Sequence, residues 1–403
     1  MKRLIALFIC LCALTANAQV KTITGSQWVG TWATAPQIPV KSFMPHNNNL
    51  SNRSLRQVVK VSVGGDLIRL RFSNVYSTEP VVIRSVYIAT STDSFDILPK
   101  TAKYLKFQNK YTATIPAGKT LVSDAIKFDL KAMQKLAITI NYTSAPANPT
   151  VHMGSRTTSY IMKGVTNAKS DFSTSFRENH WFNIDGIDVY NSTAHSVAII
   201  GNSITDGKGS ADNLQNRWPD MLSEYLQLKH KITHVGVLNL GIGNNRVATT
   251  GGFGIMAKLR FDRDILMQSG VKTVIIFEGV NDIGNAKGNS ETVASMLIAA
   301  YKEMIQKAKA RHLKVVMATI TPFKNAGYYS PFHEAARETV NQWIRANKSE
   351  FDGLLDFDEL LRDPADPSCL KKEYQSDWLH PNPAGYKVMG EYAANELVKL
   401  KLL

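Results

Sequence analysis

Residues 197–207 read Val-Ala-Ile-Ile-Gly-Asn-Ser-Ile-Thr-Asp-Gly, and this stretch decides the fold predicted for the C-terminal half of the chain. Four consecutive apolar residues are typical of a strand that is buried on both faces of a sheet. The run stops at Gly201, so Ser203 follows the carboxyl end of the strand, where open α/β sheets bind their ligands. Two interpretations of Ser203 stay open at this point: a reactive hydroxyl, or an N-cap of the next helix.

Strand and helix patterns alternate from this stretch to the C-terminus, which predicts a parallel sheet with helices on both faces. Five strands fit the flavodoxin-like order 2-1-3-4-5, and we expect this α/β domain to span residues 195–403. In the longest helix the apolar residues share one stripe, and Ser290 is the expected N-cap. The expected strands are 197–200, 235–240, 274–277, 315–320 and 354–357, and the expected helices are 219–228, 256–267, 291–311, 334–347 and 383–399.

The preceding part of the chain, residues 26–192, alternates apolar and polar residues with period two and shows almost no helical periodicity. We expect an all-β sandwich domain here. The alternating runs on both sides of Gly64-Gly65 predict a β-hairpin with one dry face and one wet face. Three tryptophans, Trp28, Trp32 and Trp181, form either a sugar-stacking platform or part of the core.

Residues 1–18 have the pattern of a signal peptide. A basic start precedes an apolar run at 4–14, and Ala-Asn-Ala at 16–18 supplies an A-x-A cleavage site. We therefore predict a secreted or periplasmic protein without a membrane anchor. Cleavage leaves Cys369 as the remaining cysteine of the sequence, so no internal disulfide is expected.

The sequence carries a formal net charge of +14, but the basic residues are dispersed and form no nucleic-acid-binding motif. We therefore expect no nucleic-acid partner. The nine histidines lack metal-ligand spacing, and no phosphate-binding loop occurs. Neither a metal nor a cofactor is expected.

A polar segment near the C-terminus complements Ser203. Asp377 precedes His380 by three residues, in a proline-rich loop that leads into the last helix. If the loop folds back, the carboxylate accepts the Nδ1 proton of the ring and leaves Nε2 free as a base. Such a base activates a serine hydroxyl, so the three residues are a candidate triad; a purely structural histidine is the alternative.

Two other predicted strand ends offer hydrogen-bond donors to the oxyanion that develops in acyl transfer. Residues 239–246 read Asn-Leu-Gly-Ile-Gly-Asn-Asn-Arg, where glycines expose backbone amides. Residues 278–282 read Glu-Gly-Val-Asn-Asp and carry the side-chain amide of Asn281. Because parallel strands end at one edge of a sheet, we expect these groups beside Ser203.

Taken together, these segments resemble the four sequence blocks of the SGNH (GDSL-type) hydrolase family, over residues 195–403. The matching blocks are 201–203, 241–244, 279–282 and 377–380. Residues 28–36 and 217–220 are also similar to a secreted bacterial branch that carries a β-rich domain before the hydrolase. The resemblance implies an esterase or acylhydrolase activity.

The same resemblance implies a role for each residue of the site. Ser203 would attack the ester carbonyl and donate its backbone N–H to the oxyanion. The side-chain amide of Asn281 and the backbone N–H of Asn244 would be the other donors. His380 would relay the proton, and Asp377 would hold the ring.

Two positions depart from the family pattern. Asn202 replaces the usual aspartate beside the serine, and Asn244 stands where the family has glycine, although asparagine tolerates left-handed geometry well. Arg246 is a further candidate, either for binding an anionic group of the substrate or for a surface salt bridge. Glu278 and Asp282 would suit a glycosidase pair, but nothing in their spacing indicates the required separation across a sugar ring.

The sequence therefore predicts an exported two-domain serine esterase that removes short acyl groups, acetyl above all, from carbohydrate esters. Two alternatives are open. A lipase or lysophospholipase would prefer long acyl chains. A carbohydrate-binding protein with a degenerate hydrolase domain would bind an acylated carbohydrate without turnover.

Overall fold

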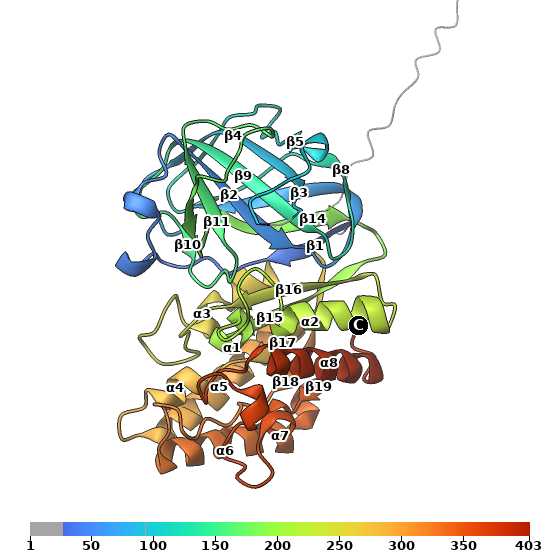
Figure 1. Ribbon diagram of the computed structural model, residues 1–403. Helices are drawn as coiled ribbons and strands as arrows, with labels where there is room; N and C mark the ends of the chain where they lie inside the picture. Colours follow the sequence, from blue (N-terminus) through green and yellow to red (C-terminus); the bar gives the residue numbers. More distant parts are fainter. Residues whose placement is uncertain (1–26, 93) are drawn as a thin grey trace, which may run out of the picture.

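The computed structural model describes residues 27–92 and 94–403, so the predicted signal peptide lies outside the described residues. An all-β half, drawn from blue to green, packs on an α/β half, drawn from green to red (Figure 1). None of the helices within the described ranges combines the length and the apolar character that crossing a membrane requires.

The all-β half contains two large antiparallel sheets and a short ribbon. One sheet has the order β1-β14-β3-β7, with β8 also paired to β3. The other has the order β12-β11-β2-β9-β4-β5, with β6 also paired to β4. One apolar cluster takes residues from both sheets, as in a sandwich. The strands are β1 (Trp28–Ala33), β2 (Arg53–Lys60), β3 (Gly65–Ser73), β4 (Val81–Thr90), β5 (Lys103–Tyr104), β6 (Ala113–Ile115), β7 (Thr120–Val122), β8 (Ile126–Leu130), β9 (Lys135–Ser144), β10 (Val151–His152), β11 (Ser159–Lys163), β12 (Phe176–Glu178), β13 (Trp181–Phe182) and β14 (Ile184–Tyr190).

The predicted hairpin around Gly64-Gly65 is wrong. β2 pairs with β9 and β11, whereas β3 pairs with β14, β7 and β8, so the connection crosses from one sheet to the other. The two strands bury side chains in the shared core instead of pairing edge to edge, and β2 is buried along almost its whole length.

The tryptophans of this half belong to the interior. Trp28, Trp32 and Trp181 are all buried, and the last two pack edge to face with their ring centroids 5.0 Å apart. The interpretation of these three residues as a sugar-stacking platform is therefore wrong, and the core interpretation is confirmed.

The α/β half is built on a five-stranded parallel sheet. Its order, β16-β15-β17-β18-β19, is the predicted 2-1-3-4-5. The strands are β15 (His195–Gly201), β16 (Val235–Gly241), β17 (Val271–Phe277), β18 (Lys314–Ala318) and β19 (Gly353–Leu355). The helices are α1 (Ser203–Asp206), α2 (Trp218–Glu224), α3 (Ala257–Phe261), α4 (Val280–Gly284), α5 (Ser290–Ala310), α6 (Pro331–Ala346), α7 (Phe357–Leu361) and α8 (Pro383–Lys399), with π-helical turns at Tyr225–Lys229 after α2 and Asp262–Leu266 after α3.

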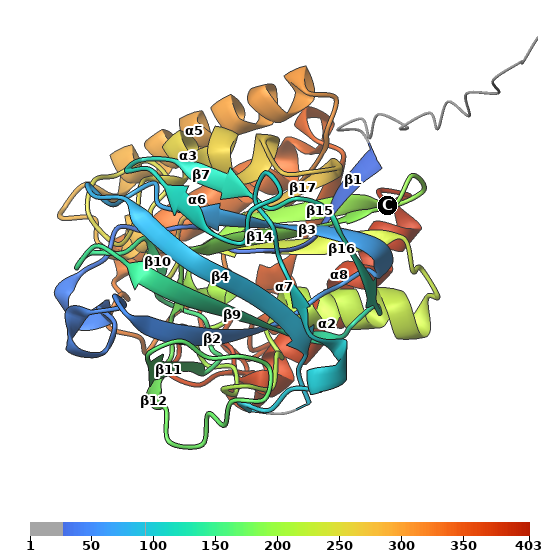
Figure 2. The ribbon, with the colours of Figure 1, turned by 90° about the horizontal axis from the view of Figure 1, so that it is seen from above.

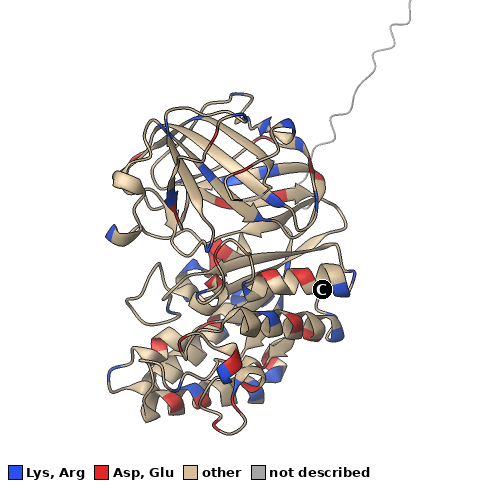
Figure 3. Cartoon of the chain, in the orientation of Figure 1, with Lys and Arg blue, Asp and Glu red and all other residues tan. Residues whose placement is uncertain are grey.

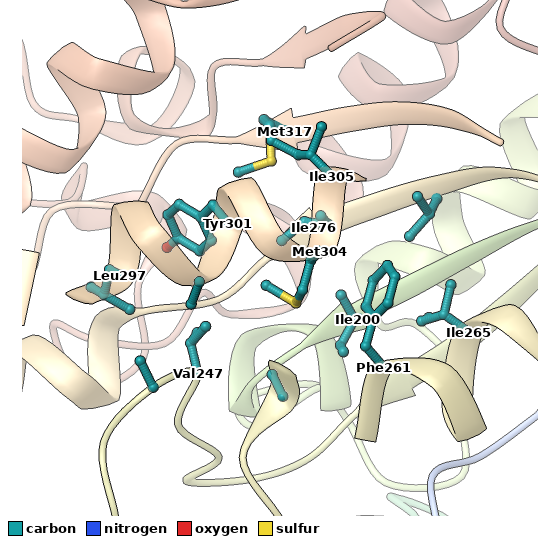
Figure 4. Packing of buried hydrophobic residues seen from close by; sticks show 14 of the residues in the cluster. Ile200, Val247, Phe261, Ile265, Ile276, Leu297, Tyr301, Met304, Ile305 and Met317 are labelled. Carbon is teal, nitrogen blue, oxygen red and sulfur yellow. The ribbon is translucent and has the colours of Figure 1, made fainter. Parts of the chain in front are cut away.

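Helices cover both faces of this sheet, because alternate residues of each strand point to opposite sides. Ile200, Ile276 and Met317 pack with α3, α5 and α6 in one apolar cluster (Figure 4). Ile199 and Ile275 pack with α2, α7 and α8 in another cluster. Figure 2 shows α3 and α5 on one side of the parallel strands and α2 and α8 on the other.

The N-cap of α5 is Asn289, whose side chain accepts a hydrogen bond from Thr292 N, rather than the predicted Ser290.

The two halves meet where β1 lies against β16. There Gly30 N donates to Ser269 O at 2.9 Å and Ser196 Oγ donates to Gly30 O at 2.9 Å. Basic and acidic residues are scattered over both halves (Figure 3).

Candidate active site

Ser203 begins α1 directly after the carboxyl end of β15. The N-cap of this helix is Asn202, whose side chain accepts a hydrogen bond from Ile204 N at 3.0 Å. The interpretation of Ser203 as the cap is therefore wrong. Its hydroxyl Oγ lies 2.8 Å from Nε2 of His380 instead.

His380 is oriented by Asp377, as the three-residue spacing predicted. Nδ1 of the ring lies 2.9 Å from Oδ2 and 3.0 Å from Oδ1 of the carboxylate. The backbone N–H of His380 also donates to Oδ1 at 2.8 Å, and Trp378, between them, takes a left-handed φ of 66° that closes the turn. An ionised carboxylate only accepts, so Nδ1 carries the proton and Nε2 presents its lone pair to the serine.

The carboxylate of Asp377 is held in its ionised form. Its partial burial acts to raise the pKa, but hydrogen bonds from the ring and backbone of His380, and from the backbone of Leu379, outweigh burial and hold the pKa of Asp377 well below its usual range. The group beside the ring therefore stays negatively charged across neutral and mildly acidic pH.

Two backbone N–H groups at this strand edge are available as donors. Ser203 is the first residue of its helix, where an N–H has no intrahelical acceptor. Asn244 adopts a left-handed φ of 53°, the geometry that the glycine of the family pattern would supply. The neighbouring Gly243 N–H is not free, because it donates to Oδ2 of Asp206 at 3.0 Å.

The side chain of Asn281 is fixed from two sides. Its Nδ2 donates to Asn245 O at 2.8 Å, and its Oδ1 accepts from Tyr328 OH at 3.1 Å. An amide nitrogen carries two hydrogens, so one remains for a ligand. Ser203, Asn244, Asn281 and His380 all line one cavity of about 420 Å³.

The all-β half supplies the opposite wall of this cavity, which the sequence did not predict. The residues that it contributes include Gln37, Phe43, Met153, Arg156, Asn179 and His180. They come from loops and short strands that precede the serine by many residues and share no local pattern. The glycine at 154, in the loop that carries Arg156, is a weak signal at most.

One contact joins this wall to the donors of the α/β half. His152 is buried, and its Nε2 lies 2.9 Å from Oδ1 of Asp206, whose other oxygen holds Gly243 N. Gly154 packs so closely on the same carboxylate that an added Cβ would lie 1.9 Å from Oδ2. Residues on both sides of the domain junction thus set the position of the 241–244 loop.

Arg246 is not among the described residues that line the cavity; its guanidinium donates to Thr250 O.

The structure does not support Glu278 and Asp282 as a glycosidase pair. Glu278 is fully buried beside Arg260, and both oxygens of Asp282 accept backbone N–H groups of Val247 and Ala248. Within the described residues, no cluster of three or more His, Cys, Asp or Glu side chains is arranged to hold a metal ion.

Residues 199–388 match the model of the GDSL-like lipase/acylhydrolase family. The chain carries a GDSL-like hydrolase domain. The match confirms the resemblance read from the four sequence blocks, and the GDSL-like domain includes Ser203, Asn244, Asn281, Asp377 and His380. A comparison with curated proteins found no match.

Several solved structures are similar to this chain. A lipolytic protein of the G-D-S-L family from Desulfitobacterium hafniense is 26% identical and covers 50% of this chain and 99% of its own, with a TM-score of 0.39. A family two carbohydrate esterase from Clostridium thermocellum, solved with cellohexaose, is 16% identical and covers 85% and 95%, with a TM-score of 0.40. A carbohydrate acetylesterase from Sinorhizobium meliloti is 14% identical and covers 51% and 99%, with a TM-score of 0.39.

Proposed function

We propose that the protein is an exported serine esterase that removes short acyl groups, acetyl above all, from carbohydrate esters. The observation that carries the proposal is the relay from Asp377 through His380 to the hydroxyl of Ser203, at 2.9 and 2.8 Å, in a cavity with free N–H donors. Nucleophile, base and orienting carboxylate are the parts that acyl transfer requires. Export rests on the signal peptide predicted at 1–18.

The reaction proceeds in two halves. His380 Nε2 takes the proton of Ser203 as Oγ bonds to the ester carbonyl carbon, and the carbonyl oxygen becomes an oxyanion that accepts from Ser203 N, Asn244 N and Asn281 Nδ2. The imidazolium returns the proton to the alcohol oxygen as the ester C–O bond breaks. The same ring then takes a proton from water as the water oxygen bonds to the acyl carbon, and it returns that proton to Ser203 Oγ as the bond between Oγ and the acyl carbon breaks and the acid leaves.

The chemistry of the cavity wall supports a hydroxylated alcohol as the leaving group. Nδ1 of His180 lies 2.7 Å from Met153 O, so it carries the ring proton and leaves Nε2 as an acceptor for a hydroxyl. Burial lowers the pKa of His180 and outweighs the opposing effect of its hydrogen bond to Met153 O, so the ring is neutral. Phe43 and Phe253, with their ring centroids 5.8 Å apart, add an apolar surface for a short acyl group or a sugar face.

The test is the hydrolysis of p-nitrophenyl acetate by Ser203→Ala. We expect a loss in kcat/KM on the order of 10³-fold or more, from the behaviour of serine triads. Ser210→Ala is the matched control, because that hydroxyl donates to Gly207 O and is not among the described cavity residues. Equal rates for the Ser203 variant and the wild type would refute the nucleophile.

An acyl-chain series separates the proposal from the alternatives. We expect the highest kcat/KM with acetyl esters, falling through butyryl to octanoyl. A rise with chain length would indicate a lipase. Binding of acetylated polysaccharide with no turnover of any ester would indicate a degenerate binding protein.

A further inference from the structure

We propose that the cavity contains a carboxylate-binding subsite centred on Arg156, so that the substrate is the acyl ester of an acidic sugar. The inference rests on the proposed esterase function and specifies the alcohol half of its substrate. An acetyl group carries no charge, so the carboxylate belongs to the sugar.

Arg156 lines the same cavity as Ser203 and His380 and lacks an internal partner. Its Nε is buried without a hydrogen-bond partner, and its guanidinium takes part in none of the ion pairs found among the described residues. A guanidinium has five donors in a rigid planar fork, and leaving a buried one unsatisfied is costly. A ligand carboxylate would satisfy the fork in bidentate fashion.

The loop that carries Arg156 is fixed before any ligand binds. The residue has a left-handed φ of 50°, which is strained for a long side chain, and its carbonyl accepts from Asn213 N at 2.9 Å. On one side Gly154 packs on Asp206, and on the other Thr157 accepts from Gln215 Nε2 at 2.6 Å. The contacts to the α/β half therefore aim the side chain at the cavity that holds the serine.

The surroundings of Arg156 favour an anion. Lys208 adds a second cation to the lining. Gln37 is fully buried; its Oε1 accepts from Met153 N, and its Nε2 is a donor without a hydrogen-bond partner among the described residues. Asp206 is the carboxylate among the described lining residues, and its two oxygens are engaged by His152 and Gly243. The charge of Arg156 is therefore not neutralised within the described site.

The test compares two substrates that differ by one charge: an O-acetylated galacturonide and its carboxyl methyl ester. For the wild type we expect kcat/KM for the free acid to exceed that for the methyl ester roughly tenfold, as for a charge-assisted bidentate pair. In Arg156→Gln the ratio falls to about one, and in Arg156→Lys it is intermediate, because lysine keeps the charge without the fork. Arg84→Gln, an exposed arginine on β4, keeps the wild-type ratio.

A second measurement needs no variant. Galacturonate should inhibit hydrolysis of p-nitrophenyl acetate competitively and more strongly than galactose, and added salt should weaken the difference. Equal turnover of both esters by the wild type, or an unchanged ratio in Arg156→Gln, overturns the subsite while leaving the esterase intact. Loss of the esterase proposal itself would show separately, as Ser203→Ala activity equal to that of the wild type.

Discussion

His152 and Asp206, which lie in different halves of the chain, are joined by a contact of 2.9 Å between Nε2 and Oδ1. Nδ1 of the same ring lies 2.9 Å from Ala35 O, so both ring nitrogens face oxygen acceptors. The second oxygen of Asp206 accepts from Gly243 N, so the all-β half orients the loop that presents the N–H of Asn244.

The first prediction concerns this positioning contact. His152→Ala should lower kcat on the order of tenfold or more with a small change in KM, because a displaced donor mainly weakens the transition state. His152→Gln, which keeps a donor towards Asp206, should recover part of the loss. The exposed His234→Ala is the control. A folded His152→Ala protein with wild-type kcat would contradict the role.

The second prediction concerns Asp377. Asp377→Asn should lower kcat on the order of 10³-fold, because an amide no longer favours the tautomer with the proton on Nδ1. Steady-state kinetics check this, with Asp363→Asn, a half-buried loop residue outside the described lining of the cavity, as the control. Hydrogen bonds hold the pKa of Asp377 well below the usual range. The pH profile of kcat for the wild type should therefore show no change between pH 4 and 9 that is due to protonation of this carboxylate.

The third prediction concerns the amide of Asn281. Asn281→Ala should lower kcat on the order of 10²–10³-fold and leave KM nearly unchanged, as expected for a donor to the oxyanion. Tyr328→Phe removes the hydrogen bond to Oδ1 but keeps the amide, so its loss should be smaller. If the two variants lose equal activity, Asn281 acts through its packing and not as a donor.

The fourth prediction concerns stability and Glu278. Complete burial raises the pKa of Glu278 to about 8, against the opposing charge of Arg260, and the charges of Asp282 and Asp264 add to the rise. A raised folded-state pKa means that this group's contribution to stability is full below its ordinary value of 4.5 and is lost as pH rises through about 8.

Glu278→Gln imitates the neutral acid, so the variant should become more stable than the wild type as pH rises from 5 to 9, on the order of a few kcal/mol. Urea unfolding at pH 5, 7 and 9 measures this, with the exposed Glu338→Gln as the control. A constant difference between variant and wild type across this range would show that Glu278 does not titrate there.

Much of the α/β half could be predicted because each buried strand is a continuous apolar run and each strand end carries a short polar block. Parallel strands place those blocks at one edge, so Ser203, Asn244 and Asn281 could be expected together before any coordinates. His380 was expected beside them from the spacing of Asp377 and His380 in the loop before the last helix. The strands that pair with β2 could not be predicted. A strand of alternating residues can pair with the next strand along the chain, or it can lie in the other sheet of the sandwich, and both arrangements bury the same apolar face.

The residues of the opposite wall were missed for a related reason. Arg156 and His152 lie outside the four blocks. Only the packing of the two halves brings Arg156 into the cavity that holds Ser203, and His152 into contact with Asp206. Arg246, by contrast, stands next to a block, yet its guanidinium turns towards Thr250. Proximity in sequence was therefore a poor guide to the groups that meet the substrate.

The division of the cavity wall between two halves separates bond cleavage from recognition along the polypeptide. In the proposed mechanism every group assigned to the carbonyl follows Gly201, whereas residues 37–180 supply Gln37, Phe43, Met153, Arg156, Asn179 and His180 to the described lining. Grafting a different 152–156 loop onto the same scaffold would exchange one preferred ester for another without disturbing the nucleophile. Under the proposed function, the preferred ester could thus change through the all-β half alone while the serine, histidine and aspartate stay the same.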